Sequence, residues 1–149
     1  MFDCINKFTL KDKKFFLKDV SIDEGIKPLV DSINSIKYFA SMNSCQGTLL
    51  INESNNHCPK TYVDFYVLHH KYELAHMLFS ILVNKFDDGV ICEVEYEPDF
   101  VLENENEIDY NGWINLRFCL QINDDRIDFE DTYKNVIDTI KEFNKILIK

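Results

Sequence analysis

Apolar and polar positions repeat with two different periods along this chain, and each period predicts a different kind of element. Every second residue is apolar in residues 61–68 and 113–122, which is typical of strands with one buried face. Residues 90–96 (VICEVEY) are rich in β-branched and aromatic types, which favour strands. The short apolar segments 36–40 and 49–51 predict two more strands.

Three other segments place apolar residues three or four positions apart, which predicts helices with one buried face. These segments are residues 21–35, 74–82 and 129–146. The sequence Ser21-Ile22-Asp23-Glu24 has the form of a capping box at the start of the first helix. Pro28 lies too deep for that start, because proline interrupts helical hydrogen bonding. The helix is therefore expected either to kink at Pro28 or to begin later, and to end near residue 35.

The other two helices carry signals at their ends. The sequence Asp87-Asp88-Gly89 follows the second helix, and we expect Gly89 to take the left-handed conformation that commonly ends helices. Asp128 precedes the last helix as its expected N-cap. Glu130 and Asp131 then lie at the positive end of the helix dipole, where negative charge is stabilising.

Polar segments connect these elements. Residues 41–47 are expected to form a polar loop, and residues 52–60 a turn-rich loop. Residues 98–112 form either a long acidic loop or a hairpin connection. Residues 5–20 have a mixed pattern that fits either a strand or a short helix.

The order of these elements predicts one domain that spans residues 1–149. Groups of strands separated by helices predict an α+β fold. We expect a two-layer sandwich in which helices cover one face of a mixed or mostly antiparallel sheet. An exposed edge strand in so small a sheet also makes a homodimer one expected assembly.

Composition and charge limit the class of protein, its expected location and its expected partners. The 149 residues are 46% hydrophobic and 28% charged, which is typical of a globular domain. The formal net charge of −10 argues against general affinity for nucleic acid, whose phosphates require lysine and arginine. Residues 1–20 hold no uninterrupted apolar stretch, and no run approaches the ~20 residues of a membrane span. We therefore expect a cytoplasmic protein without a membrane partner, whose five cysteines are reduced thiols.

The polar loop carries the strongest candidate for a binding site. Its candidate ligand-binding residues are Ser41, Ser44, Cys45, Gln46 and Gly47. Hydroxyl, thiol, amide and backbone N–H groups of this kind can hold an anion or a small ligand. The glycine permits a positive φ or a close backbone approach. The alternative is a hydrogen-bonded turn that joins two strands and buries the cysteine.

Histidines and other cysteines offer fewer signals. His69 and His70 follow the strand 61–68, and because imidazole titrates near neutral pH either one is a candidate general base. His69 is also one of the candidate ligand contacts. A metal site built from Cys45, His57 and Cys58 lacks the paired Cys-x-x-Cys spacing of zinc sites, so no metal is assigned. No P-loop or G-x-S-x-G motif is present, and catalytic residues stay unassigned.

One long motif and one short motif resemble a known family. Residues 21–47 combine Ser-Ile-Asp-Glu, an apolar helix with a proline and an Ile-Asn-Ser end, an aromatic strand, and Ser-Cys-x-Gly. Residues 94–98 read Val-Glu-Tyr-Glu-Pro. This pattern resembles the tRNA wybutosine-synthesising methyltransferase family, which also has a histidine near the position of His69. The resemblance implies a nucleotide, nucleoside or S-adenosylmethionine-like ligand and, for an enzyme, S-adenosylmethionine-dependent methylation of tRNA.

A second function is expected from the charge. Thr48 stands where that family has arginine, and the net charge of −10 is unfavourable for a tRNA enzyme. The alternative is a non-catalytic interaction or inhibitor protein whose acidic face binds a basic protein partner. The acidic segment 97–109 is its main support in the sequence. A pocket under Cys45 would favour the first function, and a face covered by carboxylates would favour the second.

Overall fold

A computed structural model of the chain describes residues 4–18, 21–47, 60–104 and 107–148, with the backbone alone for 100–104 and 107–111. The elements, in chain order, are α1 (Leu10–Phe16), α2 (Lys27–Ser35), β1 (Phe39–Gln46), β2 (Thr61–Val67), the 3₁₀ turn η1 (Leu68–His70), α3 (Tyr72–Phe86), the 3₁₀ turn η2 (Asp87–Gly89), β3 (Val90–Asn104), β4 (Glu107–Ile122) and α4 (Phe129–Leu147). The expected strand at 49–51 and most of the expected loop at 52–60 lie outside these described residues.

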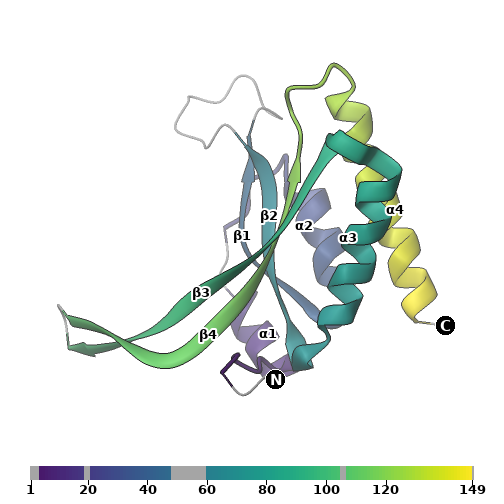
Figure 1. The fold of residues 1–149 in the computed structure, drawn as a ribbon. Helices are drawn as coiled ribbons and strands as arrows, with labels where there is room; N and C mark the ends of the chain where they lie inside the picture. The colour runs from purple at the N-terminus through teal and green to yellow at the C-terminus, as the bar shows by residue number, and fades with distance from the viewer. Residues whose placement is uncertain (1–3, 19–20, 48–59, 105–106, 149) are drawn as a thin grey trace.

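The four strands form one antiparallel sheet in the order β1-β2-β4-β3. Helix α3 leaves the end of β2 and returns the chain to β3, on the far side of β4. Figure 1 shows α2, α3 and α4 together on one face of this sheet. The predicted α+β sandwich is therefore confirmed, and its sheet is antiparallel throughout the described part of the chain.

The core lies between the sheet and these three helices. Phe65 of β2 is fully buried there, with the Phe39 ring centroid at 4.8 Å and the Phe118 ring centroid at 5.7 Å. Burying a side chain of this size stabilises the fold by about 1.5–3 kcal/mol. The neighbours Asp64 and Tyr66 point to the other face, because side chains alternate along a strand. The period of two predicted for residues 61–68 is confirmed.

Helix α2 begins later than its apparent capping box. It starts at Lys27, with Pro28 in the first turn, where a proline removes no helical hydrogen bond. Ile26 is the N-cap residue, so the predicted capping by Ser21 is wrong. The start at Lys27 matches the second of the two expected outcomes, and the end at Ser35 is as predicted.

Strand β1 overturns the prediction for residues 36–47. The expected strand at 36–40 followed by a loop is wrong, because β1 spans Phe39–Gln46 and pairs with β2 along its length. Its polar residues find partners in the sheet and in the neighbouring helix: the Ser41 backbone N–H donates to Asn34 Oδ1 at 2.8 Å. The register of β1 with β2 shifts between Ser41 and Asn43.

Helix α3 ends on an aspartate instead of a glycine. Asp87 has a φ of 50°, whereas Gly89 is not among the residues with positive φ, so the predicted role of Gly89 is wrong. A Cβ atom at Gly89 would lie 3.2 Å from Thr132 Cγ2, so this glycine lets α4 approach closely. Helix α4 starts at Phe129 after its predicted N-cap Asp128.

Strands β3 and β4 are longer than predicted and form a hairpin that leaves the body of the protein. Of the two structures expected for residues 98–112, the hairpin is right, since β3 and β4 stay paired from Pro98↔Ile114 to Asn104↔Glu107. We call residues 98–104 and 107–114 the β3–β4 arm. The arm projects away from the helices (Figure 1).

The N-terminal segment, whose pattern allowed a strand or a helix, forms helix α1 after a single bridge between Ile5 and Ile114. Helix α1 does not belong to the layer of α2, α3 and α4. Its Phe16 packs against Tyr66, with 5.3 Å between ring centroids, on the other side of the sheet. No helix among the described residues is long and apolar enough to cross a membrane.

Candidate functional site

The residues predicted to bind a ligand are spread along β1 and to the far end of its partner strand β2. Ser41 and Gln46 are buried on β1 and hold the α2 segment. The Ser41 hydroxyl accepts a hydrogen bond from Asn34 Nδ2 at 2.8 Å, and Gln46 Oε1 accepts one from the Gly25 backbone N–H at 3.1 Å. Both side chains therefore join the sheet to the segment before and within α2.

Three more predicted residues lie at the end of β1. Cys45 is buried, and Ser44 is half-buried. Gly47 has a φ of +57°, and a Cβ there would lie 2.5 Å from Thr61 Oγ1. The expected positive φ and close approach at Gly47 are both confirmed, and they make it a turn residue.

His69 lies at the opposite end of the same strand pair. It sits in η1, just after Val67, which pairs with Phe39 at the start of β1. Eight strand residues separate this end from Gly47, a span of about 25 Å at about 3.3 Å per residue. The His69 ring packs edge-on against Tyr38 at 5.9 Å. Ligand binding by these six residues therefore stays a prediction.

The face of the sheet opposite α2, α3 and α4, which we call the open face, carries a different constellation, centred on Arg117 of β4. Helix α1 packs on this same face beside Tyr66. Its guanidinium forms a close ion pair with Glu95 and lies 3.5 Å from Glu97 and 3.9 Å from Asp64. Glu97 also accepts a hydrogen bond from the Tyr66 hydroxyl at 2.7 Å. The register brings these side chains together: Glu95 pairs with Arg117 across β3–β4, and Tyr66 pairs with Arg117 across β2–β4.

Burial and charge act in opposite directions on this group. Burial raises the pKa of Asp64, while the hydrogen bond from Cys119 and the charge of Arg117 lower it. Burial, with the hydrogen bond to Asp64, raises the pKa of Cys119 to about 12. Because the thiolate is the reactive form, the raised pKa disfavours Cys119 as a nucleophile at neutral pH. The clustered charges favour recognition of a charged partner.

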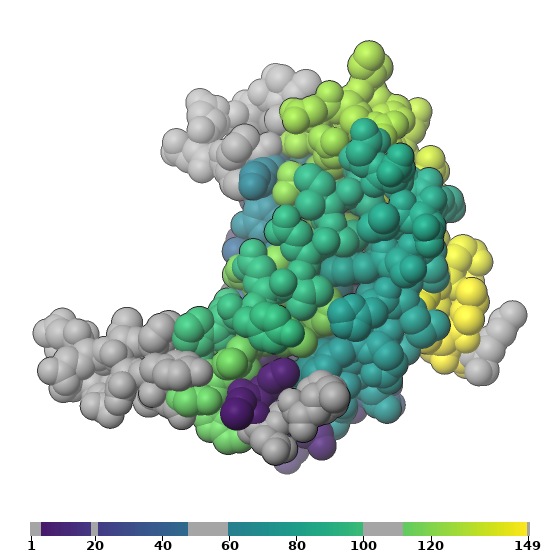
Figure 2. Space-filling view, in the orientation of Figure 1, coloured from purple at the N-terminus to yellow at the C-terminus, as the bar shows by residue number. Residues whose placement is uncertain are grey.

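A small hollow of about 140 Å³ opens over this group. It is lined by Lys60, Tyr62, Asp64, Ile91, Glu93, Glu95, Arg117, Cys119 and Gln121. Three carboxylates and two cations line it, and Glu97 adds a further carboxylate beside Arg117. We call Asp64, Glu93, Glu95 and Glu97 the acidic cluster. The concave left edge of the coloured surface in Figure 2 lies over β2, β4 and β3.

The hollow is too small for a drug-sized molecule, since ligand pockets usually hold about 300–1,000 Å³. Its volume suits a single inserted side chain. Sequence reasoning found the polar alternation of β2 and β4 but not this site. The register between strands far apart in the chain, which places Asp64 and Glu95 around one arginine, has no signal in the sequence.

The described part of the predicted acidic segment 97–109 contributes side chains at residues 97–99. Glu97 belongs to the acidic cluster, and Asp99 Oδ1 accepts a hydrogen bond from Asn115 Nδ2 at 3.4 Å. The side chains at 103, 105, 107 and 109 lie outside the described residues.

Metal ligands are not assembled in the described part of the chain, where no three histidine, cysteine or carboxylate side chains could hold an ion. His57 and Cys58 lie outside the described residues. Comparisons with protein-family models, with curated proteins and with solved structures find no match. The resemblance to the wybutosine-synthesising family, and with it S-adenosylmethionine or tRNA as ligands, therefore stays a prediction from the motifs.

Proposed function

We propose that this chain is a non-catalytic interaction protein, which binds a basic segment of a partner protein on the open face of its sheet. The observation that carries this proposal is the acidic cluster around the hollow. Within the lining, the three carboxylates outnumber the two cations, and Glu97 adds to the excess. A lysine or arginine of a partner would be attracted to this excess.

The shape of the face fits an extended basic segment. Glu93 and Glu95 are exposed on β3, and they alternate with residues that point to the opposite face. A partner in extended conformation presents every second side chain to one side, so its basic residues can match this spacing. Ile91 is 39% exposed beside them and can contact the aliphatic stem of a lysine.

Binding to a short fluorescein-labelled peptide of alternating lysine and threonine tests the proposal by fluorescence anisotropy. The double variant Glu93→Gln/Glu95→Gln removes two negative charges from the acidic cluster. We expect it to bind the peptide about fivefold more weakly at low salt, because exposed ion pairs contribute about 0.2–1 kcal/mol each. Binding by the native chain should weaken as salt rises.

The matched control is Asp138→Asn/Glu142→Gln, which removes the same charge from exposed positions on α4. This control should bind the peptide as the native chain does. Equal weakening in both double variants would mean that the peptide responds only to net charge. That result would contradict a binding face at the acidic cluster.

A further inference from the structure

A second hollow, of about 400 Å³, has a lining with more positive than negative side chains, in contrast to the hollow over the acidic cluster. It opens where four segments meet: the end of α2, the start of β1, the start of α3 and the end of α4. Its lining is Ile36, Lys37, Tyr38, Lys71, Glu73, Leu74, Asn144, Leu147 and Ile148. Its volume falls within the about 300–1,000 Å³ of small-molecule sites.

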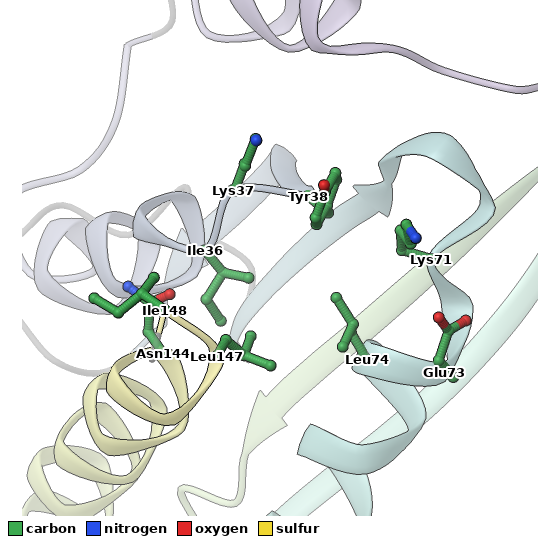
Figure 3. Close-up of a pocket in the computed structure, with 9 residues that line it drawn as sticks. All are labelled: Ile36, Lys37, Tyr38, Lys71, Glu73, Leu74, Asn144, Leu147 and Ile148. Carbon is green, nitrogen blue, oxygen red and sulfur yellow. The ribbon is translucent and has the colours of Figure 1, made fainter.

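The floor of this hollow is apolar. Ile36, Leu74 and Leu147 come from three different segments, and Figure 3 shows all three pointing toward its centre. Ile36 is itself only 1% exposed, so it forms a fixed base. The backbone there is held by Lys13, whose Nζ donates to the carbonyl oxygens of Ile36 and Lys37 at 2.9 and 3.1 Å.

Two lysines stand at the rim. The ammonium groups of Lys37 and Lys71 lie 5.4 and 5.7 Å from the centroid of the Tyr38 ring. Figure 3 shows this ring between the two lysine side chains. Among the described residues the ion pairs involve other cations, so neither ammonium is matched with a carboxylate. Glu73 also lines the hollow, and the lining therefore carries one excess positive charge.

We propose that this hollow binds a small amphipathic monoanion, a carboxylate attached to an apolar chain or ring. Lys37 and Lys71, on either side of the Tyr38 ring, make the rim positive and attract the carboxylate, and the Tyr38 ring lies against the bound molecule. The apolar part rests on Ile36, Leu74 and Leu147. A single excess positive charge favours a monoanion over a dianion. This site is independent of the acidic cluster, which lies on the other face of the sheet.

The fluorescent monoanion 8-anilinonaphthalene-1-sulfonate is a suitable probe, because its emission rises in apolar surroundings. The native chain should bind it saturably. The variant Lys37→Gln/Lys71→Gln should bind it about fivefold more weakly or worse, since both positive charges of the rim are lost. Unchanged binding in this variant overturns the proposal.

The control variant Lys27→Gln/Lys134→Gln loses the same charge away from the hollow. Lys134 lies about 20 Å along α4 from Leu147, at about 1.5 Å per residue, and Lys27 forms an exposed pair with Asp31. This control should bind the probe as the native chain does. Equal weakening in the control overturns the assignment of the site, and far-UV circular dichroism checks that each variant is folded.

Displacement identifies the ligand class. Decanoate should displace the probe, whereas decanol, which has the same chain without the charge, should require about fivefold more. Leu147→Trp, which fills the hollow from the partly exposed end of α4, should weaken probe and decanoate together. Equal displacement by decanol would contradict the role of the lysines, and full binding by Leu147→Trp would contradict the hollow itself.

Discussion

Lys13 shows how one side chain can join two helices. Its ammonium lies on α1 and donates to three backbone carbonyl oxygens, those of Asn34, Ile36 and Lys37, at 2.9–3.1 Å. These carbonyls lie at the end of α2 and just after it, where they have no partner within that helix, so the lysine serves as a C-terminal cap from a distant part of the chain. Burial lowers the pKa of Lys13 to about 8.

Replacing Lys13 by methionine should lower the free energy of unfolding by about 1–3 kcal/mol at pH 7, because hydrogen bonds from a charged donor are lost. The pH dependence gives a second test. Between about pH 8 and the ordinary lysine pKa of 10.5, the unfolded chain binds the proton more tightly than the folded chain. The stability of the native chain relative to Lys13→Met should therefore rise across this range.

Urea denaturation at pH 7 and pH 10 measures both effects. Lys14→Met, at the exposed neighbouring position, is the control and should change little at either pH. A difference between native chain and Lys13→Met that stays constant with pH would contradict the lowered pKa. No loss of stability at pH 7 would contradict the capping role.

Elements whose apolar residues repeat at a regular spacing could be predicted from the sequence. Elements that depend on hydrogen bonds to distant parts of the chain could not. The alternation of β2 and the helical spacing of α3 and α4 depend on local burial, so the sequence carries them. Strand β1 was missed because its polar residues are satisfied by Asn34 and Gly25, which lie elsewhere in the chain. The candidate site could not be predicted for the same reason, since Asp64 and Arg117 are brought together by the register of β2 with β4.

A substitution at Gly47 tests the conformation of the turn that follows β1. Gly47→Ala must hold alanine at a φ of +57° and place a Cβ 2.5 Å from Thr61 Oγ1 and 2.8 Å from the Lys60 carbonyl carbon. A left-handed conformation alone costs about 1–2 kcal/mol, so we expect a loss of stability of about 2 kcal/mol or more. Gly112→Ala is the matched control, because Gly112 has a φ of +85° and no atom within 4 Å of the added Cβ.

Thermal and urea unfolding of the two variants would separate the cost of the left-handed backbone conformation from the cost of the steric clash at Thr61 and Lys60. Gly112→Ala should lose only the cost of the backbone conformation and remain the more stable of the two. The account of the β1 turn would be contradicted if Gly47→Ala were as stable as the native chain or as Gly112→Ala.

At the scale of the whole molecule, the net charge of −10 is distributed unevenly. The open face of the sheet carries the acidic cluster, whereas the junction of α2, α3 and α4 with β1 carries Lys37 and Lys71 around an apolar floor. The two hollows therefore differ in the charge of their linings and lie on opposite sides of the sheet, and we propose that they bind ligands of opposite charge. The net charge of −10 predicts the acidic hollow but not the positively charged one.

We propose above all that a basic segment of a partner protein binds at the acidic cluster. Amide chemical shifts of the ¹⁵N-labelled chain, followed while the lysine–threonine peptide is added, test it residue by residue. We predict shifts concentrated in β2, β3 and β4 around Asp64, Glu95 and Arg117, with the amides of Lys37 and Tyr38 unmoved. Shifts centred on α4, or spread evenly over the acidic surface, would contradict the claim.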